Sequence, residues 1–232
     1  MEQEPISMIA LAYRFKKRLT ASLPYWLEQN VNIHICSTKD DPDGTRKAIF
    51  DLAVKYPRRI KLHTFDLRPL QRAAMYYKVI TERINTKFCA FFDLDIIPPP
   101  HLIEKIYPCI NDRVGITTPR VDLPDEVVNQ VLTRDIASFG YNDIYAAHLN
   151  HKGKGPMKNE AKCFYGYLQV GTTESFRKAS PTTEYVGVNV HDVEFRNKLI
   201  ANGAQIRVFD KLLLLHLSHP RFGHIENKRF NL

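Results

Sequence analysis

The stretch that decides the fold is residues 88–101, Phe-Cys-Ala-Phe-Phe-Asp-Leu-Asp-Ile-Ile-Pro-Pro-Pro-His. Its first five residues are apolar and too few for a buried helix, so they predict a buried strand of a parallel sheet. Three prolines cannot continue a central strand, so we expect Asp93 and Asp95 at its carboxyl end, where open α/β sheets bind ligands. Two carboxylates there suit Mg²⁺ or Mn²⁺. The alternative is that one aspartate caps a helix and the other is solvated.

The sequence on both sides of this stretch alternates between strand-like and helix-like patterns. We expect strands at residues 6–12, 31–36, 60–65 and 88–92, and helices at residues 15–29, 45–55 and 70–84. Strands separated by helices predict βαβ units, and therefore a Rossmann-like, mostly parallel sheet flanked by helices in one α/β domain, residues 1–232.

The second half of the chain is less regular. We expect helices at 101–107 and 191–202, strands at 114–118, 163–170, 205–209 and 212–217, and a mixture of helix and loop over 121–147. Residues 150–162 contain four lysines and two glycines with little to bury. We expect this loop to be mobile without ligands, because almost no apolar surface offsets the entropy lost on ordering.

Composition describes a globular protein with an anionic partner. The 232 residues are 44% hydrophobic, and 33 Lys and Arg against 25 Asp and Glu give a net charge of +8. Such a balance suits binding to a nucleotide, a nucleic acid or a membrane surface. The alternative is that the basic residues are surface charges that keep the protein in solution. No apolar stretch approaches a membrane span and no signal-peptide pattern is found. Cys36 and Cys89 interrupt apolar strands and predict buried thiols in a reducing, cytoplasmic setting.

The order of motifs resembles a GT-A-fold glycosyltransferase of the broad family-2 type, with a C-terminal part similar to the galactosyltransferase and polypeptide N-acetylgalactosaminyltransferase group. The resemblance rests on a first strand that opens into a nucleotide pocket, residues 37–41 (STKDD), the Asp93-Leu-Asp95 strand end, and residues 191–196 (HDVEFR) leading to 214–219 (LLHLSH). It implies a hexosyltransferase in which residues 1–100 bind a nucleotide sugar, favoured as a UDP-sugar. Residues 101–232 then carry the acceptor site and catalysis.

The resemblance also implies a metal site. Asp95 is expected to ligate Mn²⁺ or Mg²⁺, and Asp93 to contact the metal or the donor ribose. His216 matches the late histidine ligand of the family and lies on an apolar strand, where a polar side chain needs a reason. His219 is the second choice. The alternative for both histidines is that they are hydrogen-bonded core or surface residues without a role at a metal.

Asp192 matches the catalytic carboxylate of the family, which in an inverting transfer removes the proton from the acceptor hydroxyl. The family usually has two adjacent acids here, whereas this chain has His191-Asp192. That departure leaves Glu194 as an alternative acid and His191 as a helper. Asp192 would also serve as an N-cap of the helix that follows.

For the nucleotide, positions along the chain suggest five further residues. Asp40 or Asp41 follows the second strand and would hold the base or ribose, and Tyr13 follows the first strand and would stack on the base. Arg72 and Lys78 on the next helix would face the diphosphate, with a surface ion pair as the alternative for both.

Two other classes remain open. A metal-dependent phosphoryl-transfer enzyme, a nuclease or nucleotidyltransferase, would use Asp93, Asp95 and Asp192 as a two-metal cluster, but the chain has only 10 glycines and no G-x-x-x-x-G-K-[ST] loop. A non-catalytic basic nucleic-acid-binding module would explain the charge and leave the buried acids unexplained. For a glycosyltransferase, the acceptor is a glycan, a protein or a hydroxymethylated DNA base.

Overall fold

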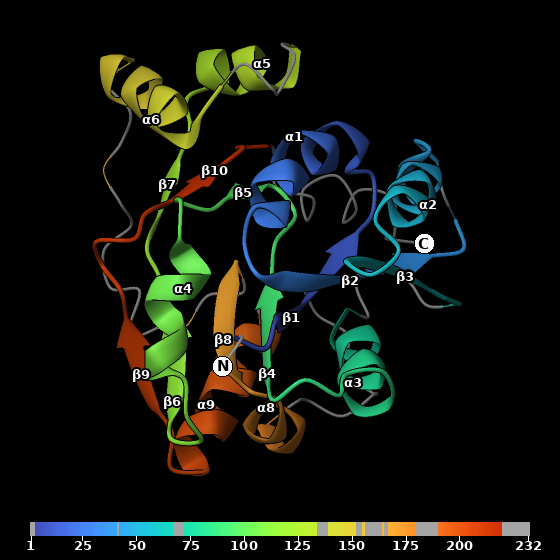
Figure 1. The fold of residues 1–232 in the computed structure, drawn as a ribbon, viewed down its shortest axis with the longest axis vertical. Helices are drawn as coiled ribbons and strands as arrows, with labels where there is room; N and C mark the ends of the chain where they lie inside the picture. Colours follow the sequence, from blue (N-terminus) through green and yellow to red (C-terminus); the bar gives the residue numbers. More distant parts are fainter. Residues whose placement is uncertain are drawn as a thin grey trace.

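Strand β4 (Phe88–Phe92) lies in the middle of a seven-stranded sheet, and all five of its residues are buried. The computed structural model describes residues 3–40, 42–66, 72–133, 139–151, 155, 164, 167–179 and 190–219. The strand order is β3-β2-β1-β4-β8-β6-β9 (Figure 1). The other strands are β1 (Ile6–Ala12), β2 (Val31–Thr38), β3 (Ile60–Phe65), β6 (Val114–Thr117), β8 (Leu168–Thr172) and β9 (Gln205–Val208).

The direction of the strands creates a switch point beside β4. Strand β1 pairs in parallel with both β2 and β4, so the chain winds outward through β2 and β3 and then returns to the other side of β1. Strand β8 is antiparallel to β4 and to β6, and β6 and β9 are parallel. The prediction of a mostly parallel sheet is confirmed. Open sheets of this kind bind ligands at the carboxyl ends of the strands that flank the switch point.

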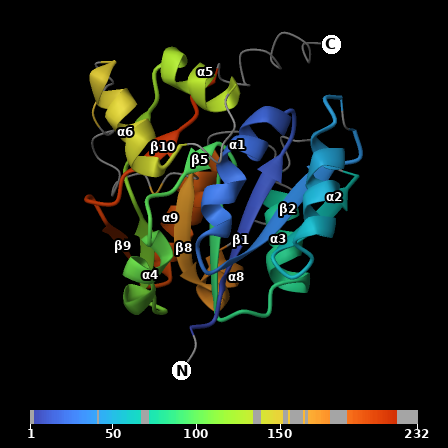
Figure 2. The same cartoon turned by 45° about the horizontal axis from the view of Figure 1, so that its top comes forward.

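Helices cover both faces of this sheet (Figure 2). Along β1, Met8 and Ala10 point into the core under one set of helices and Ile9 into the core under the other, as the two-residue period of a strand requires. The first set is α1 (Lys16–Leu27), α2 (Thr45–Lys55) and α4 (Leu102–Ile106), the last continued by a 3₁₀ turn at Tyr107–Cys109. The second set is α3 (Arg72–Glu82), α8 (Thr173–Ala179) and α9 (Val190–Ala201).

A second, three-stranded sheet lies beyond the carboxyl end of β4 (Figure 1). Its order is β5-β10-β7, with β5 (Ile96–Ile97) antiparallel and β7 (Arg120–Asp122) parallel to β10 (Leu214–His216). Helices α5 (Asp125–Thr133) and α6 (Tyr141–Asn150) pack on it through a third core that includes Val121, Val128, Ile144 and Leu215. The sequence did not predict this sheet.

Most predicted elements are confirmed, with small changes at their ends. The strand expected at 163–170 is wrong at its start, because the strand begins at Leu168 and continues to Thr172. Cys36 and Cys89 are buried, as predicted, and burial raises the pKa of the Cys89 thiol to about 12. Most of the loop 150–162, for which mobility is predicted, lies outside the described residues.

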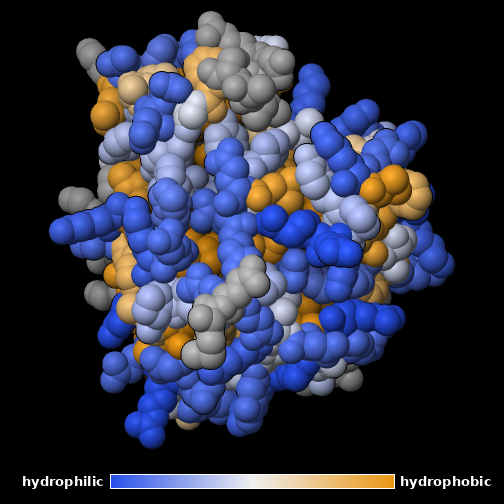
Figure 3. Space-filling model, viewed as in Figure 1, coloured by the Kyte–Doolittle hydropathy of each residue, from blue (hydrophilic) through white to orange (hydrophobic). Residues whose placement is uncertain are grey.

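The surface in the view of Figure 3 is mostly hydrophilic, with a hydrophobic patch over α2. Phe50 and Val54 of this helix are exposed by 59% and 65%. Among the described helices, none combines the length and the apolar character that crossing a bilayer requires.

Candidate functional site

Asp95 is the acid that the fold buries. It lies in the turn between β4 and β5 with 2% of its surface exposed. The amide of Leu217 donates to the Asp95 carbonyl at 2.8 Å, which ties the end of β10 to this turn. Asp93, directly after β4, is half-buried, and its amide donates to the carbonyl of Tyr167 at 3.3 Å. The two acids of the motif therefore have different surroundings.

Two imidazoles meet the Asp95 carboxylate. His216 pairs with Ile96 across the β10–β5 ladder, which places it beside Asp95. The Nε2 atoms of His216 and His219 lie 3.2 Å and 2.9 Å from Asp95 Oδ2. The ligand atoms of the three residues lie within 4.8 Å of one another, and no other such group of three or more His, Cys, Asp or Glu occurs in the described part of the chain. Asp93 is outside the group, so its role at the metal or ribose stays a prediction.

Asp122 is the site residue that sequence reasoning missed. It lies opposite His216 in the parallel β7–β10 pair, and its Oδ1 is 2.7 Å from His216 Nδ1. This contact gives Nδ1 the proton and directs Nε2 toward Asp95, the arrangement found around histidines that ligate metals. A strand of three residues shows no periodicity in the sequence, so no sequence pattern indicated Asp122.

The pKa values follow from these contacts. Burial alone would raise the pKa of Asp95, but the hydrogen bonds with His216 and His219 outweigh it and hold the pKa well below its usual value. Burial alone would lower the pKa of His216, but its hydrogen bonds with Asp122 and Asp95 raise the pKa to about 9. The hydrogen bond from His216 likewise lowers the pKa of Asp122. The site therefore favours positive charge beside Asp95.

One atom of the cluster is uncommitted. Asp95 Oδ1 is buried and has no hydrogen-bond partner among the described residues. A buried carboxylate oxygen is normally paired or bound to a metal. One carboxylate and two imidazoles form a donor set that fits a divalent transition-metal ion. The cluster is therefore suited to hold such an ion.

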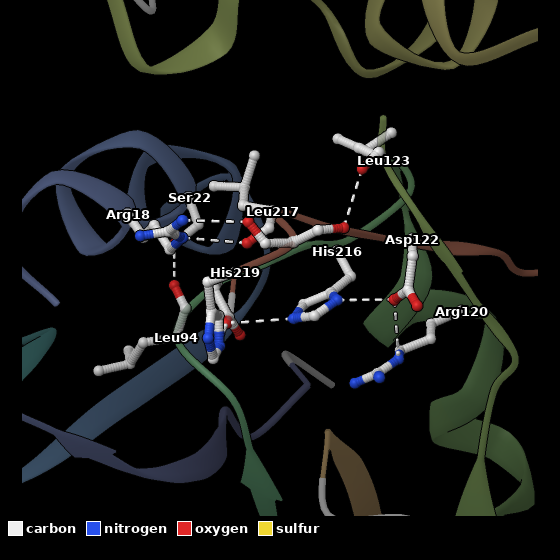
Figure 4. A network of polar contacts seen from close by, with 11 residues as sticks. Arg18, Ser22, Leu94, Arg120, Asp122, Leu123, His216, Leu217 and His219 are labelled. Carbon is white, nitrogen blue, oxygen red and sulfur yellow. Dashed lines mark hydrogen bonds and ion pairs between the residues drawn. The ribbon is translucent and has the colours of Figure 1, made fainter. Parts of the chain in front are cut away.

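Arg18 of α1 holds the segment that carries the two histidines (Figure 4). Its Nε donates to the carbonyl of Leu217 at 3.1 Å, and its terminal nitrogen donates to the carbonyl of Ser218 at 3.0 Å. Ser22, one turn later on the same helix, donates to the carbonyl of Leu94. Helix α1 thus binds the acidic turn and the histidine segment together.

The residues proposed for the nucleotide are only partly brought together. Tyr13 and Asp40 follow the adjacent strands β1 and β2, and the Tyr13 hydroxyl donates to Asp40 Oδ2 at 3.5 Å. Asp41 lies outside the described residues. Arg72 begins α3, and its side chain is likewise not described, whereas Lys78 is exposed on the same helix. The roles of all five stay predictions.

Both candidate catalytic acids lie at the start of α9. Asp192 is half-buried in the first turn, and Glu194 Oε1 lies 3.4 Å from Lys198 Nζ. Phe195 of this helix is buried, with its ring centroid 5.2 Å from that of Phe91 in β4. The helix is therefore anchored on the strand that leads to Asp95. The catalytic roles of Asp192 and Glu194, and of His191 as helper, stay predictions.

Comparison with protein-family models and with curated proteins gives no match. Solved structures do match. Mannosyltransferase PcManGT from Pyrobaculum calidifontis, solved with GDP-Man and Mn²⁺, gives a TM-score of 0.60 at 15% identity, over 98% of this chain and 61% of that chain. GalNAc-T7, solved with UDP, GalNAc and Mn²⁺, gives 0.61 at 7% identity, over 91% of this chain and 43% of that chain.

The chain thus spans less than two thirds of both proteins. The inositol-1-phosphate CTP transferase from T. maritima also matches, with a TM-score of 0.53 at 11% identity, over 95% of this chain and 92% of that chain. At such identities the matches establish architecture. The chain therefore has the GT-A fold of glycosyltransferases such as PcManGT and GalNAc-T7.

Proposed function

We propose that the chain is a metal-dependent glycosyltransferase that moves a sugar from a nucleotide sugar, favoured as a UDP-sugar, to an acceptor hydroxyl. The observation that carries this proposal is the convergence of Asp95, His216 and His219 after β4, beside the switch point. Two structures of the same fold, PcManGT and GalNAc-T7, were solved with Mn²⁺ and a nucleotide or nucleotide sugar, which supports it.

Asp95, His216 and His219 would hold the metal, and Asp93 would contact the metal or the donor ribose. Mn²⁺ fits better than Mg²⁺, because Mg²⁺ prefers oxygen ligands and two of the three donors here are imidazole nitrogens. Bound there, the ion would neutralise the negative charge that develops on the diphosphate as the nucleotide leaves. Asp122 keeps His216 oriented for this role.

The donor would lie over the carboxyl ends of β1 and β2, in the half formed by residues 1–100. Tyr13 would stack on the base, and Asp40 or Asp41 would hold the base or ribose. Arg72 and Lys78 would face the diphosphate. The contact between Tyr13 and Asp40 supports this assignment, because it places both side chains at one edge of the sheet.

The acceptor would lie in the half formed by residues 101–232. Asp192 would take the proton from the acceptor hydroxyl as the hydroxyl oxygen bonds to the anomeric carbon of the donor sugar. The bond from that carbon to the diphosphate would break on the opposite face. The sugar configuration would invert. We favour Asp192 over Glu194, because the position of Asp192 matches the catalytic carboxylate of the family that the sequence resembles. The acceptor is a glycan or a hydroxymethylated DNA base, and the net charge of +8 suits either if it is anionic.

A nucleotidyltransferase is the second candidate, because the match to the T. maritima CTP transferase covers 92% of that protein. A two-metal cluster would require several acids that face the metals. The third nearby acid, Asp122, is committed to His216 instead, and Asp95 meets imidazoles. The donor set therefore favours glycosyl transfer.

A donor panel separates the two candidates. We would titrate UDP-, GDP- and dTDP-sugars and CTP with and without Mn²⁺ by calorimetry, and then analyse the products by chromatography. We expect Mn²⁺-dependent binding of a nucleotide sugar and slow release of the nucleoside diphosphate, both lost in Asp95→Asn. Asp112→Asn, which removes an exposed acid elsewhere, should behave as the wild type. Pyrophosphate release from CTP, with every nucleotide sugar inert, would contradict the proposal.

A further inference from the structure

Arg120, the first residue of β7, is largely buried, and its Nε has no hydrogen-bond acceptor among the described residues. Its side chain is 21% exposed, and Nε lies 3.4 Å from Asp122 Oδ1. That oxygen already accepts the Nδ1 proton of His216 at 2.7 Å, and Nε is buried with no hydrogen-bond partner among the described residues. A guanidinium carries five N–H donors, and buried donors are almost always paired. An ion pair with Asp122 therefore accounts for the position of Arg120 but leaves the buried Nε without a hydrogen-bond acceptor among the described residues.

The guanidinium is nevertheless held in place. It stacks on the ring of Tyr167, with 4.8 Å between Arg120 Cζ and the ring centroid. The carbonyl of Tyr167 accepts the amide of Asp93, so this stacking platform is bonded to the acidic motif. In Figure 4 the Arg120 side chain passes beside Asp122, and its guanidinium lies on the side of Asp122 that faces His216. The group is oriented beside the Asp95 cluster before any ligand arrives.

An oriented guanidinium with free donors is the side chain that proteins use to bind a phosphate or carboxylate through two parallel hydrogen bonds. The position of Arg120 indicates which substrate carries that group. Tyr13 and Asp40 follow β1 and β2, on one side of β4, whereas Tyr167 precedes β8 on the other side. Arg120 stacks on Tyr167, across the Asp95 cluster from the residues assigned to the nucleoside.

We propose that Arg120 binds a phosphate or carboxylate group of the acceptor, so that the enzyme glycosylates anionic acceptors. This inference rests on the proposed function, because the acceptor side is defined by where the nucleotide sugar would lie. Arg120 is then a specificity-determining residue. The positive net charge of the chain agrees with an anionic acceptor.

The test compares three small probes built on the same three-carbon backbone: glycerol 1-phosphate, glycerate and uncharged glycerol. Each is titrated by calorimetry into the protein alone and into its complex with Mn²⁺ and UDP. We expect the wild type to bind at least one of the two anions at least tenfold more tightly than glycerol, and the two anionic arms show whether phosphate or carboxylate is preferred. Arg120→Gln should lose at least tenfold in anion affinity, and Arg120→Lys should lose less. Arg113→Gln, which removes an exposed charge at the opposite end of β6, should change nothing.

Several results would overturn the inference. Equal anion affinity in Arg120→Gln and Arg113→Gln, or no anion binding by the wild type, would show that Arg120 is not an anion site. If Arg120→Gln weakens UDP binding with Mn²⁺ as much as anion binding, Arg120 serves the donor diphosphate instead. Wild type that fails to bind UDP with Mn²⁺ would contradict the proposed function, while the titration of the protein alone would still decide whether Arg120 binds anions. Melting temperatures of all variants verify that they are folded.

Discussion

Two pairs of histidines lie close together in this molecule, and the pKa of His216 in one pair is shifted in the opposite direction from the pKa values of both members of the other pair. His34 of β2 and His63 of β3 stack with ring centroids 5.2 Å apart, and Nδ1 of His34 lies 3.0 Å from Nε2 of His63. His216 and His219 have centroids 5.7 Å apart and share the Asp95 carboxylate. Burial lowers the pKa of His34 to about 3 and that of His63 to about 4, whereas the pKa of His216 rises to about 9.

The difference lies in the charges around each pair. Lys61 acts on both His34 and His63 and, like burial, lowers their pKa values. Asp95 and Asp122 surround His216 and overcome its burial. Histidine proximity alone therefore produces a neutral pair that packs in the fold. The carboxylates of Asp95 and Asp122 make the surroundings of the second pair favourable for a cation.

The largest expected effect comes from removing the carboxylate that distinguishes the two pairs. Asp95→Asn keeps both imidazoles but not the charge, so Mn²⁺-dependent binding of a UDP-sugar should fall by more than the roughly 100-fold upper range for loss of an outer-shell partner. Asp93→Asn should follow with a smaller loss. Calorimetric titration with and without Mn²⁺ measures both. His63→Gln, in the other pair, should bind donor as the wild type does, and unchanged donor affinity in Asp95→Asn would contradict the site.

The next effect concerns chemistry rather than binding. Asp192→Asn should retain Mn²⁺ and donor affinity but lose transfer by about 10²- to 10⁴-fold, the usual contribution of a general base. Glu194→Gln should stay within about tenfold of the wild type. Transfer rates, with the anomeric configuration of the product determined by NMR, check this. An active Asp192→Asn beside an inactive Glu194→Gln would identify Glu194 as the base.

A smaller effect should follow from loosening His216. Asp122→Asn removes the anionic acceptor of its Nδ1 proton, and loss of such a partner typically weakens metal affinity by about 10- to 100-fold. Titration of Mn²⁺ followed by electron paramagnetic resonance measures the affinity directly. Asp66→Asn, which removes an exposed acid paired with Lys39, is the matched control. Equal Mn²⁺ affinity in both variants would show that Asp122 does not orient the ligand.

The smallest effect on donor binding is expected from the neutral pair, which should instead govern stability in acid. His34 has a pKa of about 3 when folded and the ordinary 6.5 when unfolded, so between these values the unfolded chain binds more protons. Stability should therefore fall as the pH drops below about 6.5, by about 2 kcal/mol per histidine between pH 7 and pH 5. Urea unfolding at both pH values measures this loss. His34→Leu should reduce it without changing donor affinity at pH 7, and an unchanged loss would show that His34 is not responsible.

The length of each strand decided whether the sequence could predict it. Strands β1, β2, β3 and β4 have five to eight residues each, long enough for their apolar patterns to be recognised, and the mostly parallel sheet that carries Asp95 was predicted from them. In the second sheet only β10 lies within a predicted strand, whereas β5 and β7 have two and three residues and show no pattern. Because this sheet brings Asp122 and Arg120 to His216, those two residues could not be found from the sequence.

The sequence pattern does not distinguish His216 from His34. His34 interrupts an apolar strand just as His216 does, so the pattern alone would single out both. Only the order of motifs after Asp95 favoured His216. Which histidine meets a carboxylate depends on contacts between residues 121 positions apart, and these exist only in the folded chain.

The most direct test of the metal site is anomalous diffraction at the manganese edge from crystals grown with MnCl₂ and UDP. We expect one strong peak within coordination distance of Asp95, His216 and His219, and no peak between His34 and His63. The absence of a peak at Asp95, or a peak at the His34–His63 pair in its place, would contradict the account.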